Sequence, residues 1–175
     1  FSGNMSLKWR FTMGSIYSEV SVIPPVEILK KIIIYTFTIE SVIAAILFTE
    51  FIKKLTFTEA VWASVFHSVS AFCNAGFDIL GTESNLYPSL TGYAGSPTIN
   101  ITIMLLIVVG GIGFLTWDDV CENKWRLHRY RMQSKVILVT TGLLILLPAA
   151  FFFFTDFFAL STGKRLLACF FQSVK

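Results

Sequence analysis

Residues 66–78, FHSVSAFCNAGFD, contain the side chains of this chain that are best suited to chemistry. His67, Cys73 and Asp78 suggest a metal site or a thiol nucleophile. However, His67 and Cys73 point to different sides of a helix, and no further His or Cys nearby completes a ligand set. We therefore expect His67 to make a hydrogen bond inside a helix bundle and Cys73 to be a small buried residue. A membrane enzyme using these three residues is the alternative.

The backbone of the same stretch supports a second kind of chemistry. A short helix ending near Phe72 would carry about half a negative charge of macrodipole at its carboxyl end. A following strand with Gly76 can turn its carbonyl groups to one side, because glycine adopts backbone angles that a side chain obstructs. Rings of such carbonyls replace the water shell of a potassium ion. Phe77 is expected to pack behind the strand, and Asp78 to attract cations at its mouth.

Composition places the chain in a membrane. Of its 175 residues 54% are hydrophobic and 18 are Phe, which is far from the composition of a soluble domain. The net charge of +3 is too small to indicate nucleic-acid binding, and three cysteines indicate no disulfide framework. Because the sequence opens on Phe1 and stops at Lys175 inside an expected helix, we interpret it as a fragment of a longer polypeptide.

Three stretches are long enough to cross a bilayer core, which takes about 20 apolar residues. They are 32–52, 98–117 and 136–154, the last with an expected kink at Pro148. The uncharged segment 60–77 is shorter, and a helix ending near residue 72 would be only about 20 Å long. Thr58 and Glu59 can cap its start. We expect this segment to enter the membrane and return, which leaves nine of the fourteen Lys and Arg in the cytoplasm.

Two features inside the spans leave alternatives open. Glu40 is either part of an ion path or paired with a polar group of a neighbouring helix, and we favour the pairing. The glycines Gly110, Gly111 and Gly113 are either a hinge or small residues that allow close helix packing, and we favour packing. The basic segment 124–135 either anchors the topology or binds anionic lipids or a cytosolic partner.

The end of the chain resembles the re-entrant segment, which suggests a repeat. Both copies follow an apolar span after a short polar link, and Gln172 stands where the first copy has His67. The expected unit is a span, a short re-entrant helix, a loop and a second span. The matching positions are Ala63 with Ala168, Phe66 with Phe171, Ser68 with Ser173, and Val69 with Val174.

FHSVSAFCNAGFD, the later GGIGFLTWDDV and the basic loop that follows together resemble the Trk/Ktr/HKT superfamily of potassium transporters, closest to the bacterial Ktr and Trk membrane subunits. The resemblance implies an all-α integral membrane protein built of repeated membrane helix, re-entrant pore helix, membrane helix units, as in potassium channels. By this resemblance 1–27 is a cytoplasmic linker after a preceding unit, and 28–120 is a complete unit. Its pore helix is 58–72 and its filter 73–77. The basic loop 121–135 is cytoplasmic, and 136–175 begins the next unit, with a pore helix from about 163.

The resemblance also implies the function. Potassium would pass the backbone carbonyls of a filter in the plasma membrane, without a covalent cofactor and without enzyme activity, and coupling to sodium or protons is left open. The implied partners are a second copy of the chain, a cytosolic nucleotide-binding regulatory subunit and membrane lipids, with the Asp118-Asp119 turn and 124–135 as the surfaces to test. Lys175 departs from the small hydroxyl residue usual in the family. A non-conducting scaffold or truncated product is the remaining alternative. The implied filter residues are Cys73, Asn74, Ala75, Gly76 and Phe77.

Overall fold

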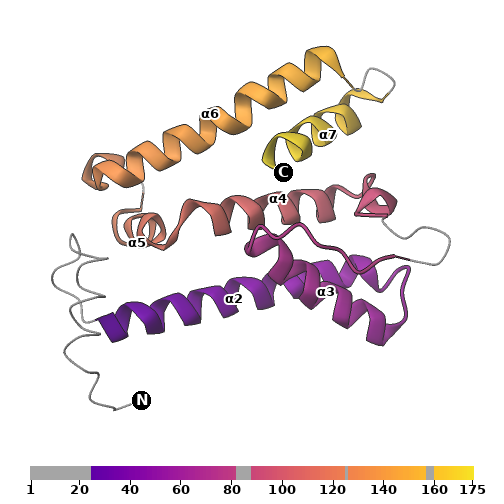
Figure 1. Cartoon of the computed structure of the whole chain (residues 1–175), viewed down its shortest axis with the longest axis horizontal. Helices are drawn as coiled ribbons and strands as arrows, with labels where there is room; N and C mark the ends of the chain where they lie inside the picture. The colour runs from indigo at the N-terminus through magenta and orange to yellow at the C-terminus, as the bar shows by residue number, and fades with distance from the viewer. Residues whose placement is uncertain (1–24, 82–87, 125, 157–159) are drawn as a thin grey trace. The chain divides into compact units, whose positions relative to one another are not determined.

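The computed structural model describes residues 25–81, 88–124, 126–156 and 160–175, and all regular structure in these ranges is helical (Figure 1). The helical class predicted from the sequence is therefore confirmed. Two short 3₁₀ turns, Thr91–Tyr93 and Leu127–Arg129, lie in the connections. The α-helices are α2 (Pro25–Phe51), α3 (Phe57–Phe72), α4 (Pro97–Ile112), α5 (Phe114–Asn123), α6 (Met132–Thr155) and α7 (Thr162–Val174).

The chain divides into two compact units at the middle of α2, after Ile39. In the first unit the described residues are 25–39, the first half of that helix, and large apolar side chains such as Ile34 and Phe37 are exposed along it. Thr38 satisfies its hydroxyl locally by donating to the carbonyl of Ile34 at 2.7 Å. An apolar, exposed helix of this kind suits a lipid environment. The second unit, from Glu40 to Lys175, contains the remaining helices.

Two described helices, α2 from Val26 onward and α6, are long and apolar enough to cross a membrane. Pro148 lies inside α6 without ending it. The stretch predicted as one span from 98 to 117 is instead two helices, α4 and α5, which meet at an angle of 100°. The cause is Gly113, whose φ of +86° lies outside the helical range. The indole nitrogen of Trp117 ties the two pieces together by donating to the carbonyl of Val109 at 2.9 Å.

Helix α3 begins and ends at positions that local hydrogen bonds explain. The Glu59 carboxylate accepts hydrogen bonds from the backbone nitrogen of Thr56 at 3.1 Å and from its hydroxyl at 2.7 Å. These bonds lower the pKa of Glu59 and mark Thr56, not the predicted Thr58, as the residue preceding the helix. At the other end the backbone leaves the helix at Asn74, where φ is +52°.

Gly110 brings α4 against the end of α3. A Cβ atom at Gly110 would lie 1.9 Å from the carbonyl oxygen of Phe72, whereas one at Gly111 would make an ordinary contact of 3.6 Å with the Asn74 side chain. The packing interpretation is therefore confirmed for Gly110. For Gly113, where an added Cβ would meet nothing within 4 Å, it is wrong, because the backbone angle is what requires glycine.

The second unit also contains two equivalent helix pairs. Ser68 on α3 donates to the carbonyl of Glu40 at 2.8 Å, and Ser173 on α7 donates to the carbonyl of Ile145 at 2.5 Å. In both cases the acceptor lies 28 positions before the serine. Since Ser68 and Ser173 are the residues aligned in the repeated sequence, the same bond joins the short helix to the long helix in both copies. Helix α7 also packs against α4, which brings the two copies together (Figure 1).

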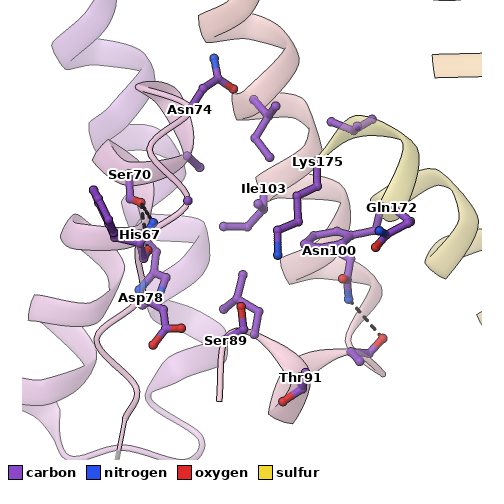
Figure 2. Close-up of a pocket in the computed structure, with 18 of the residues that line it drawn as sticks. His67, Ser70, Asn74, Asp78, Ser89, Thr91, Asn100, Ile103, Gln172 and Lys175 are labelled. Carbon is purple, nitrogen blue, oxygen red and sulfur yellow. Dashed lines mark hydrogen bonds between the residues drawn. The ribbon is translucent and has the colours of Figure 1, made fainter. Parts of the chain in front are cut away.

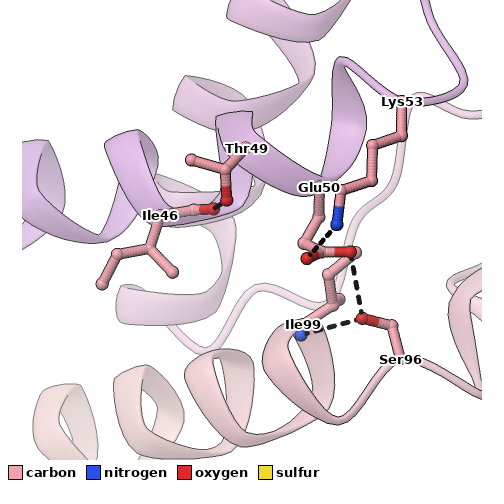
Figure 3. A network of polar contacts seen from close by, with 6 residues as sticks. All are labelled: Ile46, Thr49, Glu50, Lys53, Ser96 and Ile99. Carbon is pink, nitrogen blue, oxygen red and sulfur yellow. Dashed lines mark hydrogen bonds and ion pairs between the residues drawn. The ribbon is translucent and has the colours of Figure 1, made fainter.

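Polar contacts join the end of α2 to the start of α4 (Figure 3). Glu50 pairs with Lys53 at 2.6 Å, and its other carboxylate oxygen accepts a hydrogen bond of 3.4 Å from the hydroxyl of Ser96. Ser96 is the N-cap of α4 and accepts from the backbone nitrogen of Ile99 at 3.5 Å. Lys54 donates to the carbonyl of Gly92 at 2.8 Å. These bonds hold the loop between the two helices close to the end of α2.

The link between α5 and α6 is organised by a buried carboxylate. Asp119 accepts from the backbone nitrogen of Arg131 at 3.1 Å and from the hydroxyl of Ser134 at 2.5 Å, and the Arg131 guanidinium lies 3.6 Å from its other oxygen. Asp118 is also buried and lies 3.9 Å from the same guanidinium. Asp118 and Asp119 were expected at a surface for partner contact. That expectation is wrong, because both carboxylates face Arg131.

The contact at Gly110 gives a stability prediction. Gly110→Ala should lower the free energy of unfolding by about 1–3 kcal/mol, the usual cost of forcing an extra methyl into a packed site. Thermal unfolding of the purified full-length protein in detergent measures the change. The matched control is Gly142→Ala in α6, where an added Cβ meets nothing within 4 Å and alanine favours the helix. Equal destabilisation by both variants would contradict the contact.

Candidate functional site

The candidate site is the strand that follows α3, residues 73–78. Its first three backbone nitrogens donate to carbonyls at the end of the helix: Cys73 to Val69 at 2.9 Å, Asn74 to Ala71 at 3.1 Å, and Ala75 to Ser70 at 2.9 Å. Ser70 also holds the far end of the strand, because its hydroxyl donates to the Phe77 carbonyl at 2.9 Å and accepts from the Phe77 nitrogen at 3.1 Å. One serine therefore fixes the strand at two points.

Within the described residues, the carbonyls of residues 73–76 accept no hydrogen bond. Phe77 differs from the other predicted filter residues, since its oxygen already accepts the Ser70 hydroxyl. Residues 73–77 are exposed in the described chain, so water or an ion can reach these carbonyl oxygens. The carbonyl oxygens of residues 73–76 therefore form a short row that water or an ion could bind. The row lies between the end of α3 and the contact of Ser70 with Phe77.

The backbone angles of this row change sign from residue to residue. Cys73 has a φ of −77°, Asn74 of +52° and Gly76 of +70°, and Ala75 between them is not a positive-φ residue. An ordinary strand points successive carbonyls to opposite sides, and reversing the sign of φ at alternate residues turns them toward the same side. An added Cβ at Gly76 would meet nothing within 4 Å. Glycine is therefore needed there for its backbone angle and not for space.

Two side chains of the strand lie differently from the prediction. The Phe77 ring is 72% exposed and does not pack behind the strand, because Ser70 holds only its backbone. Cys73 was expected to be buried but is exposed, since it follows directly on the last residue of α3. Asp78 accepts a hydrogen bond of 3.2 Å from the backbone nitrogen of Leu80, which turns the chain after the strand.

His67 is buried, with 3% of its surface exposed, and makes the predicted hydrogen bond inside the helix bundle. Its Nδ1 lies 2.7 Å from the carbonyl of Ala63, and its ring contacts those of Phe51 and Phe66 at centroid distances of 5.4 and 5.7 Å. The described residues include no group of three or more His, Cys, Asp and Glu that could hold a metal ion. The arrangement gives no support to a metal or thiol site at His67, Cys73 and Asp78.

A pocket of about 430 Å³ lies beside the strand, between the end of α3, α4 and α7 (Figure 2). Sequence reasoning missed two of its polar residues, Ser70 and Asn100. The Asn100 amide donates to the carbonyls of Tyr93, Ala94 and Ser96 at 2.7–3.2 Å, so it holds the loop in front of α4. An asparagine within an apolar span was the available signal, because such a residue needs partners in lipid.

Glu40 does not line this pocket. A polar group from a neighbouring helix does reach Glu40, as the pairing interpretation expects, but the Ser68 hydroxyl bonds its backbone carbonyl and not its carboxylate. The contact therefore fixes α3 against α2 without using the charge.

Comparison with known proteins indicates the family to which the chain belongs. A sequence model of the TrkH family, described as cation transport protein, matches residues 3–174. The Ktr system potassium uptake protein B of Bacillus subtilis is 30% identical over 141 residues, which cover 80% of this chain and 30% of that protein. The potassium/sodium uptake protein NtpJ of Enterococcus hirae is 32% identical over 176 residues, covering 95% and 38%. The Ktr system potassium uptake protein B of Vibrio alginolyticus is 29% identical over 155 residues, covering 84% and 32%.

The chain spans about a third of the length of these relatives. All three are named as uptake proteins, so the comparison favours transport over the membrane-enzyme alternative. Apolar helices of spanning length and the family match together identify an integral membrane protein. Since the family match extends over nearly every residue, the chain belongs to the TrkH family of cation transport proteins.

Proposed function

We propose that this chain forms part of a potassium pathway in which the carbonyl oxygens of residues 73–77 replace the water shell of the ion. The observation that carries the proposal is the row of carbonyls at 73–76 that accept no hydrogen bond among the described residues. Potassium filters are built from such oxygens. Phe77 contributes less directly, because its carbonyl already accepts the Ser70 hydroxyl.

The position of the row supports the proposal electrostatically. It begins where α3 ends, and the carboxyl end of a helix carries about half a negative charge. Asp78 follows the row and adds a carboxylate at its far end. A dehydrated cation between these two sources of negative potential would be stabilised from both sides. No covalent step is required, and the proposed process is permeation of an ion that exchanges water oxygens for backbone oxygens.

Sodium is the second candidate substrate, because one relative is named a potassium/sodium uptake protein. Coupling of potassium to sodium or protons is compatible with the same row of oxygens. A filter of carbonyls selects between ions by the number and field of the oxygens offered. The ratio of rubidium to sodium uptake therefore measures how well residues 73–77 are positioned.

The repeated hydrogen bonds support the proposed unit structure. The bonds of Ser68 to Glu40 and of Ser173 to Ile145 are equivalent. This is expected if the helix pair α2–α3 and the helix pair α6–α7 are two copies of one repeated unit. We propose that 28–120 is one complete unit, that 136–175 begins the next, and that 1–27 and 121–135 are linkers. Several such units around one axis would be needed to close a pore.

We place the protein in the plasma membrane with 121–135 in the cytoplasm. Lys124, Arg126 and Arg129 are exposed in the link between α5 and α6, and Met132 and Val136 are exposed apolar residues in the first turns of α6. This arrangement sets the cations at the depth of anionic lipid headgroups, which we propose as their ligands. A second copy of the chain and a cytosolic nucleotide-binding regulatory subunit complete the proposed assembly. Because Asp118 and Asp119 are buried, we propose that the subunit contacts the exposed residues at 124 and 126–129.

Gly76 provides the direct test of the filter. Gly76→Ser in the full-length protein should reduce the preference for rubidium over sodium about tenfold, since a side chain disfavours the left-handed backbone by roughly 1–2 kcal/mol. Uptake is measured in cells that lack their own potassium uptake, with membrane expression quantified. The control is Gly95→Ser, where an added Cβ meets nothing within 4 Å and φ is not positive. An unchanged preference in Gly76→Ser would refute the proposed filter.

The proposed topology is tested by labelling. In a full-length background with Cys73, Cys121 and Cys169 replaced by serine, single cysteines are introduced at Lys31, Lys53 and Arg129. A membrane-impermeant maleimide should label position 53 in intact cells, and positions 31 and 129 only after the cells are opened. Labelling of 31 and 129 from opposite faces would show that α3 crosses the membrane, and the filter assignment would fall with it.

A further inference from the structure

The hydrogen bond of His67 fixes which of its ring nitrogens carries a proton. A carbonyl oxygen can only accept, so the contact of 2.7 Å between Nδ1 and the Ala63 carbonyl requires the proton on Nδ1. In the neutral ring Nε2 is then an unprotonated acceptor. This atom is buried and has no hydrogen-bond partner in the part of the chain that the structure describes. A buried acceptor without a donor is costly, so a donor is expected at this place.

Ser70 and Asn100, two polar residues of the same pocket, do not supply the donor. Ser70 uses its hydroxyl on the Phe77 carbonyl, and the Asn100 amide is used on three carbonyls in front of α4. Asp78, which lies beside His67 in Figure 2, is itself an acceptor. One of its oxygens accepts from Leu80. With a neutral His67 ring, Nε2 needs a donor, and the Asp78 carboxylate, which can accept further hydrogen bonds, cannot provide it.

The pocket that both residues line has room for water. His67, Asp78, Gly76 and Gln172 all line the pocket of about 430 Å³, and water requires only about 10–15 Å³ and two or more polar partners. A water molecule has two hydrogens, which matches the two acceptors. It can donate one to Nε2 of His67 and the other to Asp78, and accept a hydrogen bond through its oxygen.

We propose that water held in this pocket bridges His67 Nε2 and the Asp78 carboxylate, and that His67 is thereby a positioning residue for the strand 73–78. Together with Ser70, the bridge would hold the strand at its Asp78 end from the side of α3. The inference rests on the proposed filter function, because its effect is on the geometry of that strand. It assigns the ordered water and the role of His67, neither of which follows from the filter itself.

The repeated unit supplies the informative variant. Gln172 occupies the position of His67 in the second copy and lines the same pocket. A glutamine amide has a carbonyl oxygen that can accept a hydrogen bond, but it lacks the ring that contacts Phe51 and Phe66. Phenylalanine keeps an aromatic ring and loses the acceptor. His67→Gln and His67→Phe thus separate the acceptor from the packing of the ring.

The test measures rubidium and sodium uptake by the full-length protein in cells without their own potassium uptake. His67→Phe should lower the preference for rubidium over sodium about two- to tenfold, which corresponds to the free energy of one hydrogen bond. In His67→Gln the preference should stay within about twofold of that of the parent protein. A parent-like preference in His67→Phe, or equal losses in both variants, would overturn the proposal. Gly76→Ser is run in parallel: if it changes the preference and the His67 variants do not, the bridge fails and the filter stands. If Gly76→Ser has no effect, the filter proposal itself fails.

Two further measurements cover variants that fold poorly. In a double-mutant cycle, His67→Phe should cost little in an Asp78→Ala background, since the bridge is already broken there. Additive losses would argue against a shared water. In addition, a high-resolution structure of the full-length parent protein should show water density within about 2.6–3.2 Å of both Nε2 and the Asp78 carboxylate. A dry gap between the two groups would overturn the assignment.

Discussion

The structure around α3 depends on one constraint, which is the need to provide partners for the backbone groups where this short helix ends. In lipid there is no water to bond an open carbonyl, so irregular backbone at membrane depth must be covered by protein or face a wet cavity. After α3 the chain meets this constraint in two ways. Ser70 and the end of the helix satisfy the nitrogens of Asn74, Ala75 and Phe77, and the carbonyls of 73–76 stay open. An oxygen row that the protein leaves open has to be served by water or by an ion.

Keeping that row in place requires rigid supports, and these are mostly close backbone contacts. Gly110 lets α4 approach the last carbonyl of α3 more closely than any side chain would allow. Ser68 fixes α3 to the long helix behind it, and the same bond recurs at Ser173. At the opposite end of α3, Glu59 closes the first turn. The short helix is therefore held at its start, along one side and at its end, so that its dipole and its open carbonyls point to a fixed place.

Sequence reasoning reached the helical class, the special backbone angle of Gly76 and the buried hydrogen bond of His67 because each follows from local chemistry. A glycine after a short apolar helix indicates a special backbone angle, and a histidine among apolar residues needs a partner. The sequence did not predict the features that depend on which residues are neighbours in space. Phe77 looked like a packing residue, but no neighbour covers its ring in the described chain, and Cys73 proved exposed. The three glycines near 110–113 look alike in sequence, yet one serves packing and another a 100° bend.

The repeat explains why one pocket gathers residues from distant parts of the chain. Equivalent helices α3 and α7 both contact α4, so His67 and its counterpart Gln172 line the same space. In the proposed repeat the two residues that line the shared pocket differ, but histidine and glutamine can both offer a hydrogen-bond acceptor. The hydrogen bonds to the long helices face away from this space and are the same in both copies. Packing between helices therefore constrains the serines, whereas the chemistry of the pocket constrains only the kind of atom that His67 and Gln172 present.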